Sequence, residues 1–164
     1  MLIIDDDTSI HRDYHKSLLQ TAPGMSELER LEAAMFGDDD DSDHSDSAEP
    51  PPSAEPAFAL THAYQGQEAV ELVKRELGAG RRYAVAFVDV RMPPGWNGIE
   101  TTRQLWHLDP DINVVICSAH FDLEWRPQVE KLGRDNVRLL RKPFEPDELR
   151  QLAAELGRAW HDQH

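Results

Sequence analysis

Acidic, hydroxyl and ammonium side chains stand where four apolar segments of the chain end. Asp5-Asp6-Asp7 follows LII (2–4), Asp89 stands near the end of YAVAFVDV (83–90), Ser118 ends INVVICS (112–118), and Lys142-Pro143 follows the segment 137–140. Adjacent carboxylates repel one another unless a cation is shared among them. Carboxylates are ligands for magnesium, and a carboxylate is also a nucleophile that can form an acyl phosphate. These residue types predict phosphoryl transfer if the fold brings the four segment ends together.

Hydrophobic patterning predicts how the chain brings them together. We expect strands at 2–4, 58–63, 83–90, 112–118 and 137–140, and helices at 8–19, 67–77, 99–108, 123–132 and from 146 onward, with 25–36 either extending the first helix or forming its own. Alternating strands and helices predict a parallel sheet covered on both sides. Because crossovers are right-handed, the carboxyl ends of all strands share one edge, where ligands of such sheets bind.

At that edge the polar side chains divide into two roles. Asp5, Asp6 and Asp89 offer oxygen ligands for Mg²⁺, which would relieve their mutual repulsion. Lys142 and the Ser118 hydroxyl would hold phosphoryl oxygens. Catalysis at such a site consists mainly of positioning and charge neutralisation.

Composition narrows the class of protein. A chain of 164 residues is long enough for one domain with a real core. It has no apolar run of about eighteen residues and no signal-peptide pattern, so we expect no membrane span. The lone cysteine, Cys117, lies in an apolar run, which fits a buried thiol in a reducing cytoplasm. The formal net charge of −14 argues against direct nucleic-acid binding.

Much of the negative charge lies in residues 37–56, GDDDDSDHSDSAEPPPSAEP. This stretch has too few apolar residues to offset the entropy of ordering it, so we interpret it as a disordered acidic insertion. Asp38, Asp40, Ser42 and Glu49 match positions of a calcium-binding loop. Asp43 stands where that loop requires glycine, which argues against calcium.

Several motifs in their joint order resemble the receiver domain of two-component response regulators. They are Asp5-Asp6 after an apolar strand, Asp89 with Met92-Pro93 and Gly98 behind it, Ser118-Ala119, and Lys142-Pro143-Phe144. The resemblance covers nearly the whole chain apart from about 21–56. It implies a flavodoxin-like, doubly wound parallel sheet of five strands in the order 2-1-3-4-5, with helices on both faces. Residues 1–164 would then form a single receiver domain with the acidic insertion at about 37–56.

The resemblance also implies roles for individual residues. Asp89 would accept a phosphoryl group from a histidine kinase or phosphotransfer protein of a phosphorelay. Asp5, Asp6, Asp89 and the backbone carbonyl of Arg91 would bind Mg²⁺, while Ser118 and Lys142 contact the phosphoryl group. The bond from Lys142 to Pro143 would be cis. Such a domain is cytoplasmic and catalyses only its own phosphoryl transfer and dephosphorylation.

The chain departs from the family pattern in three places. The loop 92–98 is one residue longer than usual, the acidic insertion is atypical, and Leu139 stands where the family often has an aromatic switch residue. The stretch RMPPGWNGIETT is similar to receivers at the N-termini of larger signalling proteins. We therefore expect an output domain beyond His164, and a homodimer is a further expectation.

Two other functions stay open from the residues alone. A haloacid-dehalogenase-type phosphatase would use Asp5 as nucleophile and Asp7 as acid–base, but it would leave Asp89 without a role. A pseudo-receiver would bind a partner without ever accepting phosphate. We expect Asp7 to favour the start of a helix rather than to bind metal. His11 and His15 are one turn apart and could chelate a metal, but we expect an ordinary helix surface because no third ligand is indicated.

Overall fold

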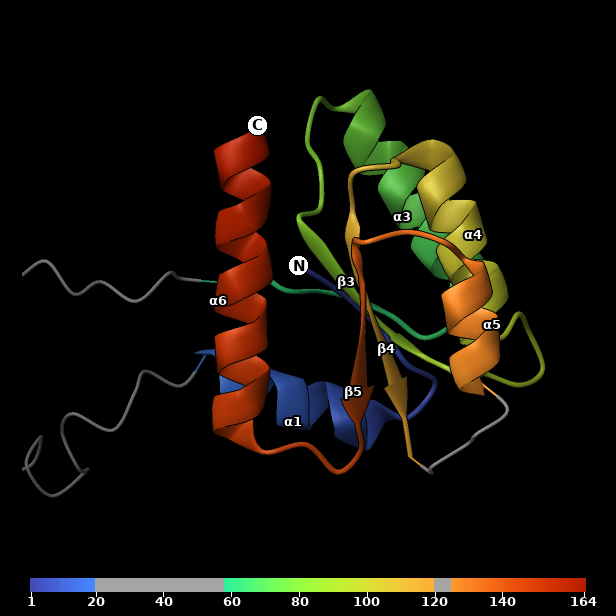
Figure 1. Ribbon diagram of the computed structural model, residues 1–164, viewed down its shortest axis with the longest axis vertical. Coiled ribbons are helices and arrows are strands. Elements are labelled where there is room, and N and C mark those ends of the chain that lie inside the picture. The colour runs from blue at the N-terminus through green and yellow to red at the C-terminus, as the bar shows by residue number, and fades with distance from the viewer. Residues whose placement is uncertain (20–57, 120–124) are drawn as a thin grey trace, which may run out of the picture.

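A computed structural model describes residues 1–19, 58–119 and 125–164 (Figure 1). Its strands are β1 (Leu2–Ile4), β2 (Thr61–Ala63), β3 (Val85–Asp89), β4 (Asn113–Ser118) and β5 (Val137–Arg141). Its helices are α1 (Thr8–Leu19), α3 (Gly66–Gly78), α4 (Gly98–Leu108), α5 (Trp125–Lys131) and α6 (Pro146–Gln163). The expected helix at 25–36 and the acidic insertion lie outside the described residues. None of the helices in the described part of the chain has both the length and the apolar character of a membrane span.

The five strands form one parallel sheet in the order β2-β1-β3-β4-β5, which confirms the predicted order. Ile4 pairs with Val88, so the acidic residues after β1 lie beside Asp89. At the other side of β3, β4 ends at Ser118, which pairs with Arg141 of β5. The register therefore brings the ends of β1, β3, β4 and β5 to one edge.

Helices cover both faces of the sheet and bury alternate residues of each strand. In Figure 1, α1 and α6 lie on one side of the sheet and α3, α4 and α5 on the other. Phe87 of β3 packs in a cluster with Tyr14 of α1 and Leu149 of α6. The next residue, Val88, faces the opposite cluster, which includes residues of α3, α4 and α5. A strand covered on both sides must be apolar throughout, which explains the sequence YAVAFVDV.

Strand lengths differ from expectation mainly at β2. The predicted strand at 58–63 begins only at Thr61, because β1, its sole neighbour in the sheet, offers three residues for pairing. The preceding residues Phe58 and Leu60 pack instead against the cluster formed with α1 and α6. At β3 the ladder likewise begins at Val85 rather than 83.

Gly98 lets the chain return tightly onto the end of β3 after the acidic edge. Its N–H donates to the Val90 carbonyl at 2.8 Å, and the Asn97 side chain caps α4 by accepting from the Glu100 N–H. A Cβ at Gly98 would lie 2.5 Å from the carbonyl oxygen of Asp89, which is backbone and cannot rotate away. A side chain here would push α4 away from the strand that ends in Asp89.

We predict that Gly98→Ala lowers the free energy of unfolding by about 1–3 kcal/mol, as overpacking does elsewhere. Urea unfolding followed by circular dichroism measures this change. Gly78→Ala is the matched control, because nothing lies within 4 Å of its added Cβ and alanine favours a helix. Equal stability of Gly98→Ala and wild type would contradict the close approach of α4 to β3.

Candidate functional site

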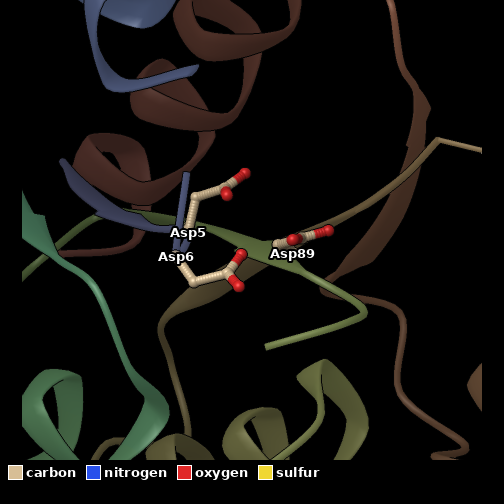
Figure 2. A group of neighbouring side chains, drawn as sticks. All are labelled: Asp5, Asp6 and Asp89. Carbon is tan, nitrogen blue, oxygen red and sulfur yellow. The ribbon is translucent and has the colours of Figure 1, made fainter. Parts of the chain in front are cut away.

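Three carboxylates converge where β1 and β3 end. Asp5 and Asp6 follow β1 directly, and Asp89 is the last residue of β3. One oxygen atom from each carboxylate lies within 4.8 Å of the others. Figure 2 shows Asp5 and Asp6 leaving the chain in different directions, with both carboxylates turned toward the side of Asp89. Asp5 is buried, Asp89 is half-buried and Asp6 is exposed.

Lys142 brings a positive charge to these carboxylates from the end of β5. Its ammonium group forms an ion pair with Asp5 Oδ2 and lies 3.4 Å from Asp89 Oδ1. The Lys142 side chain is 11% exposed. Burial disfavours its charge, but the bond to Asp5 and the charges of Asp5 and Asp89 outweigh burial and raise the pKa of Lys142.

One ammonium does not neutralise three carboxylates, and the pKa values reflect this excess. Burial raises the pKa of Asp89 to about 6, and Lys142 opposes the rise while Asp5 adds to it. Burial also raises the pKa of Asp6, with Asp5 again contributing by repulsion. Both shifts mean that the site favours added positive charge, whether as protons or as a metal ion.

The carboxylates open into a hollow of about 380 Å³. Every site residue predicted from the sequence lines it: Asp5, Asp6, Asp89, Arg91, Ser118 and Lys142. The Lys142 N–H donates to the Ser118 carbonyl at 2.8 Å, which holds the ends of β4 and β5 together. The peptide bond from Lys142 to Pro143 is cis, as the resemblance implied.

Comparison with known proteins decides the family. The family model described as the response regulator receiver domain matches residues 39–154. The chain belongs to the response regulator receiver family. The match contains Asp89, Ser118 and Lys142 but begins after β1, so the acidic pair is placed by the sheet and not by the match.

Individual relatives agree with this assignment. The chain is 30% identical to sporulation initiation phosphotransferase F of Bacillus subtilis over 93 residues. This aligned stretch covers 57% of this chain and 68% of that protein. A CheY-like receiver domain protein from Methanospirillum hungatei superposes with a TM-score of 0.64 at 18% identity, covering 99% of this chain and 96% of that one. A receiver protein from Sinorhizobium medicae gives a TM-score of 0.59 at 21% identity, with 97% and 94% covered. At these identities the solved structures show the fold alone.

Receiver domains accept phosphoryl groups and interact with histidine kinases or phosphotransfer proteins, and they often sit beside output domains. The family match therefore supports the predicted phosphoacceptor function. It favours neither the haloacid-dehalogenase-type phosphatase nor the pseudo-receiver.

Asp7 of this receiver lies outside the group of three carboxylates. Its Oδ1 accepts hydrogen bonds from the Ser9 N–H at 2.9 Å and the Ser9 hydroxyl at 2.6 Å, in the first turn of α1. These bonds lower the pKa of Asp7. The geometry agrees with the prediction that Asp7 favours the start of the helix. The same hydrogen bonds engage Oδ1 of the carboxylate that the phosphatase alternative needs as acid–base.

The prediction of an ordinary helix surface is wrong for His11. His11 is buried, its Nε2 lies 2.7 Å from the Asp5 carbonyl oxygen, and its Nδ1 lies 2.7 Å from Nδ1 of His62. His15, one turn later, is exposed as expected. The sequence carries no signal for the His11 contact because His62 comes from an edge strand 51 residues away.

Leu139 lies in a strand and Cys117 is buried, as predicted from the sequence. Leu139, in the position of the usual aromatic switch residue, is 46% exposed on β5. Cys117 is buried with its Sγ 3.0 Å from the Tyr14 hydroxyl, and burial raises the pKa of its thiol to about 12. The thiol is therefore protonated and unreactive at neutral pH.

The raised pKa of Asp89 predicts a pH-dependent change in stability. Folded Asp89 holds its proton up to about pH 6, whereas the unfolded chain loses it near 3.8, so the ionised group destabilises the fold above pH 6. Without divalent metal, we expect Asp89→Asn to raise the free energy of unfolding by ~1–2 kcal/mol at pH 8, after allowing for partial exposure. The gain should fall close to zero near pH 3, where wild-type Asp89 is mostly protonated in both the folded and the unfolded state.

Urea unfolding of both proteins in a chelating buffer at pH 8 and pH 3 measures this difference. Asp7→Asn is the control, because bonds from Ser9 lower its pKa and its loss should destabilise at pH 8. A gain for Asp89→Asn that is the same at both pH values would contradict the burial of an ionised Asp89.

Proposed function

We propose that Asp89 is the phosphoacceptor of this receiver domain, in a reaction that requires Mg²⁺. The supporting observation is the shared hollow in which Asp89 lies beside Lys142 and Ser118, with Asp5 and Asp6 next to it. The phosphoryl group comes from a histidine kinase or phosphotransfer protein.

The bonding of Asp5 and Asp89 favours Asp89 over Asp5 as the acceptor. Both oxygens of Asp5 are engaged, since Oδ1 accepts from the Asp7 N–H at 2.9 Å and Oδ2 pairs with Lys142. Asp5 is also only 2% exposed, so it is less accessible to a phosphodonor than Asp89 is. Asp89 is more accessible, and its Oδ1 lies at the longer distance of 3.4 Å from Lys142. A nucleophile needs an oxygen that can reach the phosphorus atom, and Asp89 meets that need better than Asp5 does.

The donor set fits magnesium. Mg²⁺ prefers oxygen ligands and is commonly bound through one or two carboxylates together with water and phosphate oxygens. Asp5, Asp6, Asp89 and the backbone carbonyl of Arg91 would hold it. When bound, the ion supplies charge neutralisation for the carboxylates and the phosphoryl oxygens.

The protein's own groups then account for the transfer. An Asp89 oxygen attacks phosphorus, the bond from phosphorus to the donor's imidazole nitrogen breaks, and an acyl phosphate forms as the imidazole leaves. Lys142 and the Ser118 hydroxyl bind the phosphoryl oxygens as charge develops there. Hydrolysis of the same acyl phosphate ends the signal.

Phosphorylation would shift the domain between two conformations, because Ser118 and Lys142 gain contacts that exist only in the phosphorylated state. Leu139 cannot act as an aromatic switch, so we propose that side-chain rotation on β5 carries less of the change than an aromatic residue there would. We further propose one domain over residues 1–164 with the insertion at about 37–56, a cytoplasmic location, no direct nucleic-acid contact, an output domain beyond His164 and a homodimer.

Acetyl phosphate with Mg²⁺ should add one phosphoryl group to the wild-type protein and none to Asp89→Asn. Reduction with borohydride traps the acyl phosphate, and intact mass followed by peptide mapping locates it. Lys142→Met is a useful companion because it keeps the acceptor but should label more slowly. Equal labelling of wild type and Asp89→Asn would refute the assignment, and labelling at Asp5 would favour the phosphatase alternative.

The proposed metal ligands predict that loss of Asp6 weakens Mg²⁺ binding more than loss of its neighbour Asp7. Asp6→Asn removes a proposed ligand and should weaken Mg²⁺ binding by about tenfold or more, at least as much as the loss of an outer partner does. Asp7→Asn, a matched change one residue later, should have little effect because Asp7 is bonded to Ser9. Trp96, in the loop after Asp89, can report binding by fluorescence. A larger effect of Asp7→Asn than of Asp6→Asn would show that Asp7 is a ligand.

A further inference from the structure

His11 connects the acidic end of β1 to the edge strand β2. The residue is 5% exposed, and its ring lies between two partners. The Asp5 carbonyl oxygen lies 2.7 Å from Nε2 of His11, and His62 Nδ1 lies 2.7 Å from Nδ1 of His11. Tyr64, from the segment just after β2, packs against the same ring with centroids 4.5 Å apart. These contacts restrict the orientation of the ring.

The chemistry of the partners assigns the protons. A backbone carbonyl only accepts, so Nε2 of His11 carries hydrogen. In the neutral ring Nδ1 of His11 is then an acceptor, and His62 Nδ1–H donates to it. The hydrogen bonds therefore run in one direction, from His62 to His11 to Asp5.

The distance between the two imidazoles distinguishes this pair from a metal site. Two nitrogens bound to one tetrahedral zinc ion at 2.0–2.1 Å would lie about 3.3 Å apart. The observed 2.7 Å between the Nδ1 atoms is a hydrogen-bond distance. His11 and His62 thus hold each other rather than a shared ion.

The carbonyl that His11 binds belongs to the peptide that joins Asp5 to Asp6. The other polar groups of Asp5 are also engaged: its N–H donates to the Ala63 carbonyl at 3.1 Å, and its carboxylate binds the Asp7 N–H and Lys142. With His11 bound to its carbonyl oxygen, Asp5 has a partner for its N–H, its carbonyl and both carboxylate oxygens. The orientation of the peptide plane determines the direction in which the Asp6 side chain leaves the backbone, and Asp6 has no such enclosure of its own because it is exposed.

We propose that His11 is a positioning residue for the acidic site: by binding the Asp5 carbonyl it orients the peptide between Asp5 and Asp6, so that the Asp6 carboxylate faces Asp89. His62 holds the His11 ring in place from β2. The inference rests on the proposed magnesium site, and it explains how a mostly exposed carboxylate is held in a defined direction.

The test compares Mg²⁺ affinity in wild type, His11→Leu, His11→Gln and His15→Leu, with thermal unfolding measured without metal. His11→Leu should bind Mg²⁺ about 10–100-fold more weakly, the range seen when outer partners of a metal site are lost. His11→Gln should stay within about threefold of wild type, because its amide N–H can donate to the same carbonyl. His15→Leu, exposed one turn later, should match wild type. A purely structural role would lower the unfolding midpoint of His11→Leu but leave the affinity of the folded protein unchanged.

His62→Phe provides a second variant if His11→Leu does not fold. It keeps His11 and an aromatic ring on β2 but removes the hydrogen-bond donor to His11. Mg²⁺ affinity should therefore fall by about three- to tenfold, which is no more than the loss of an outer partner of a metal site usually causes. The Asp7 amide should also exchange faster with solvent. Wild-type affinity in His11→Leu, or unchanged affinity and exchange in His62→Phe, would overturn the inference. Failure of the wild type to bind Mg²⁺ would refute the proposed magnesium site, and this inference with it.

Discussion

The ammonium group of Lys142 brings positive charge to the three carboxylates that lie together at the end of the sheet. Asp5 is 2% exposed and Asp89 is half-buried, and carboxylates in such places are costly unless they are paired. Lys142 lies 137 residues after Asp5 in the chain. It arrives only because β5 pairs with β4 and its own N–H binds the Ser118 carbonyl. The ends of β1 and β5, the first and last strands along the chain, are thus joined by one ion pair.

That ion pair leaves negative charge in excess, and the excess connects the fold to its function. Burial and repulsion raise the pKa of Asp89 to about 6, so the site without metal is partly destabilised when ionised. A divalent cation and a phosphoryl group with Lys142 beside it would satisfy the same charges. The family match establishes a receiver domain, and this charge balance gives a physical reason why Asp89, rather than the fully bonded Asp5, would be the acceptor.

How far the sequence predicts this site depends on the kind of contact. The sequence predicts the acidic pair, Asp89, Ser118 and Lys142 because each lies at or just after the end of a predicted strand, and parallel topology brings strand ends together. Asp7 was separated from them by the chemistry of helix starts. His11 was mispredicted, since its burial depends on His62 in a short edge strand whose register no local pattern reveals. The true start of β2 was missed for a related reason, because the length of β1 limits it.

The most direct measurement is a crystal structure of the protein with Mg²⁺ and beryllofluoride, a mimic of the phosphoryl group. We expect the beryllofluoride on an Asp89 oxygen, magnesium bound by Asp5, Asp6 and Asp89, and Lys142 moved from Asp5 toward the fluorine atoms. Beryllofluoride on Asp5, or Lys142 still paired with Asp5 beside an occupied Asp89, would contradict the account.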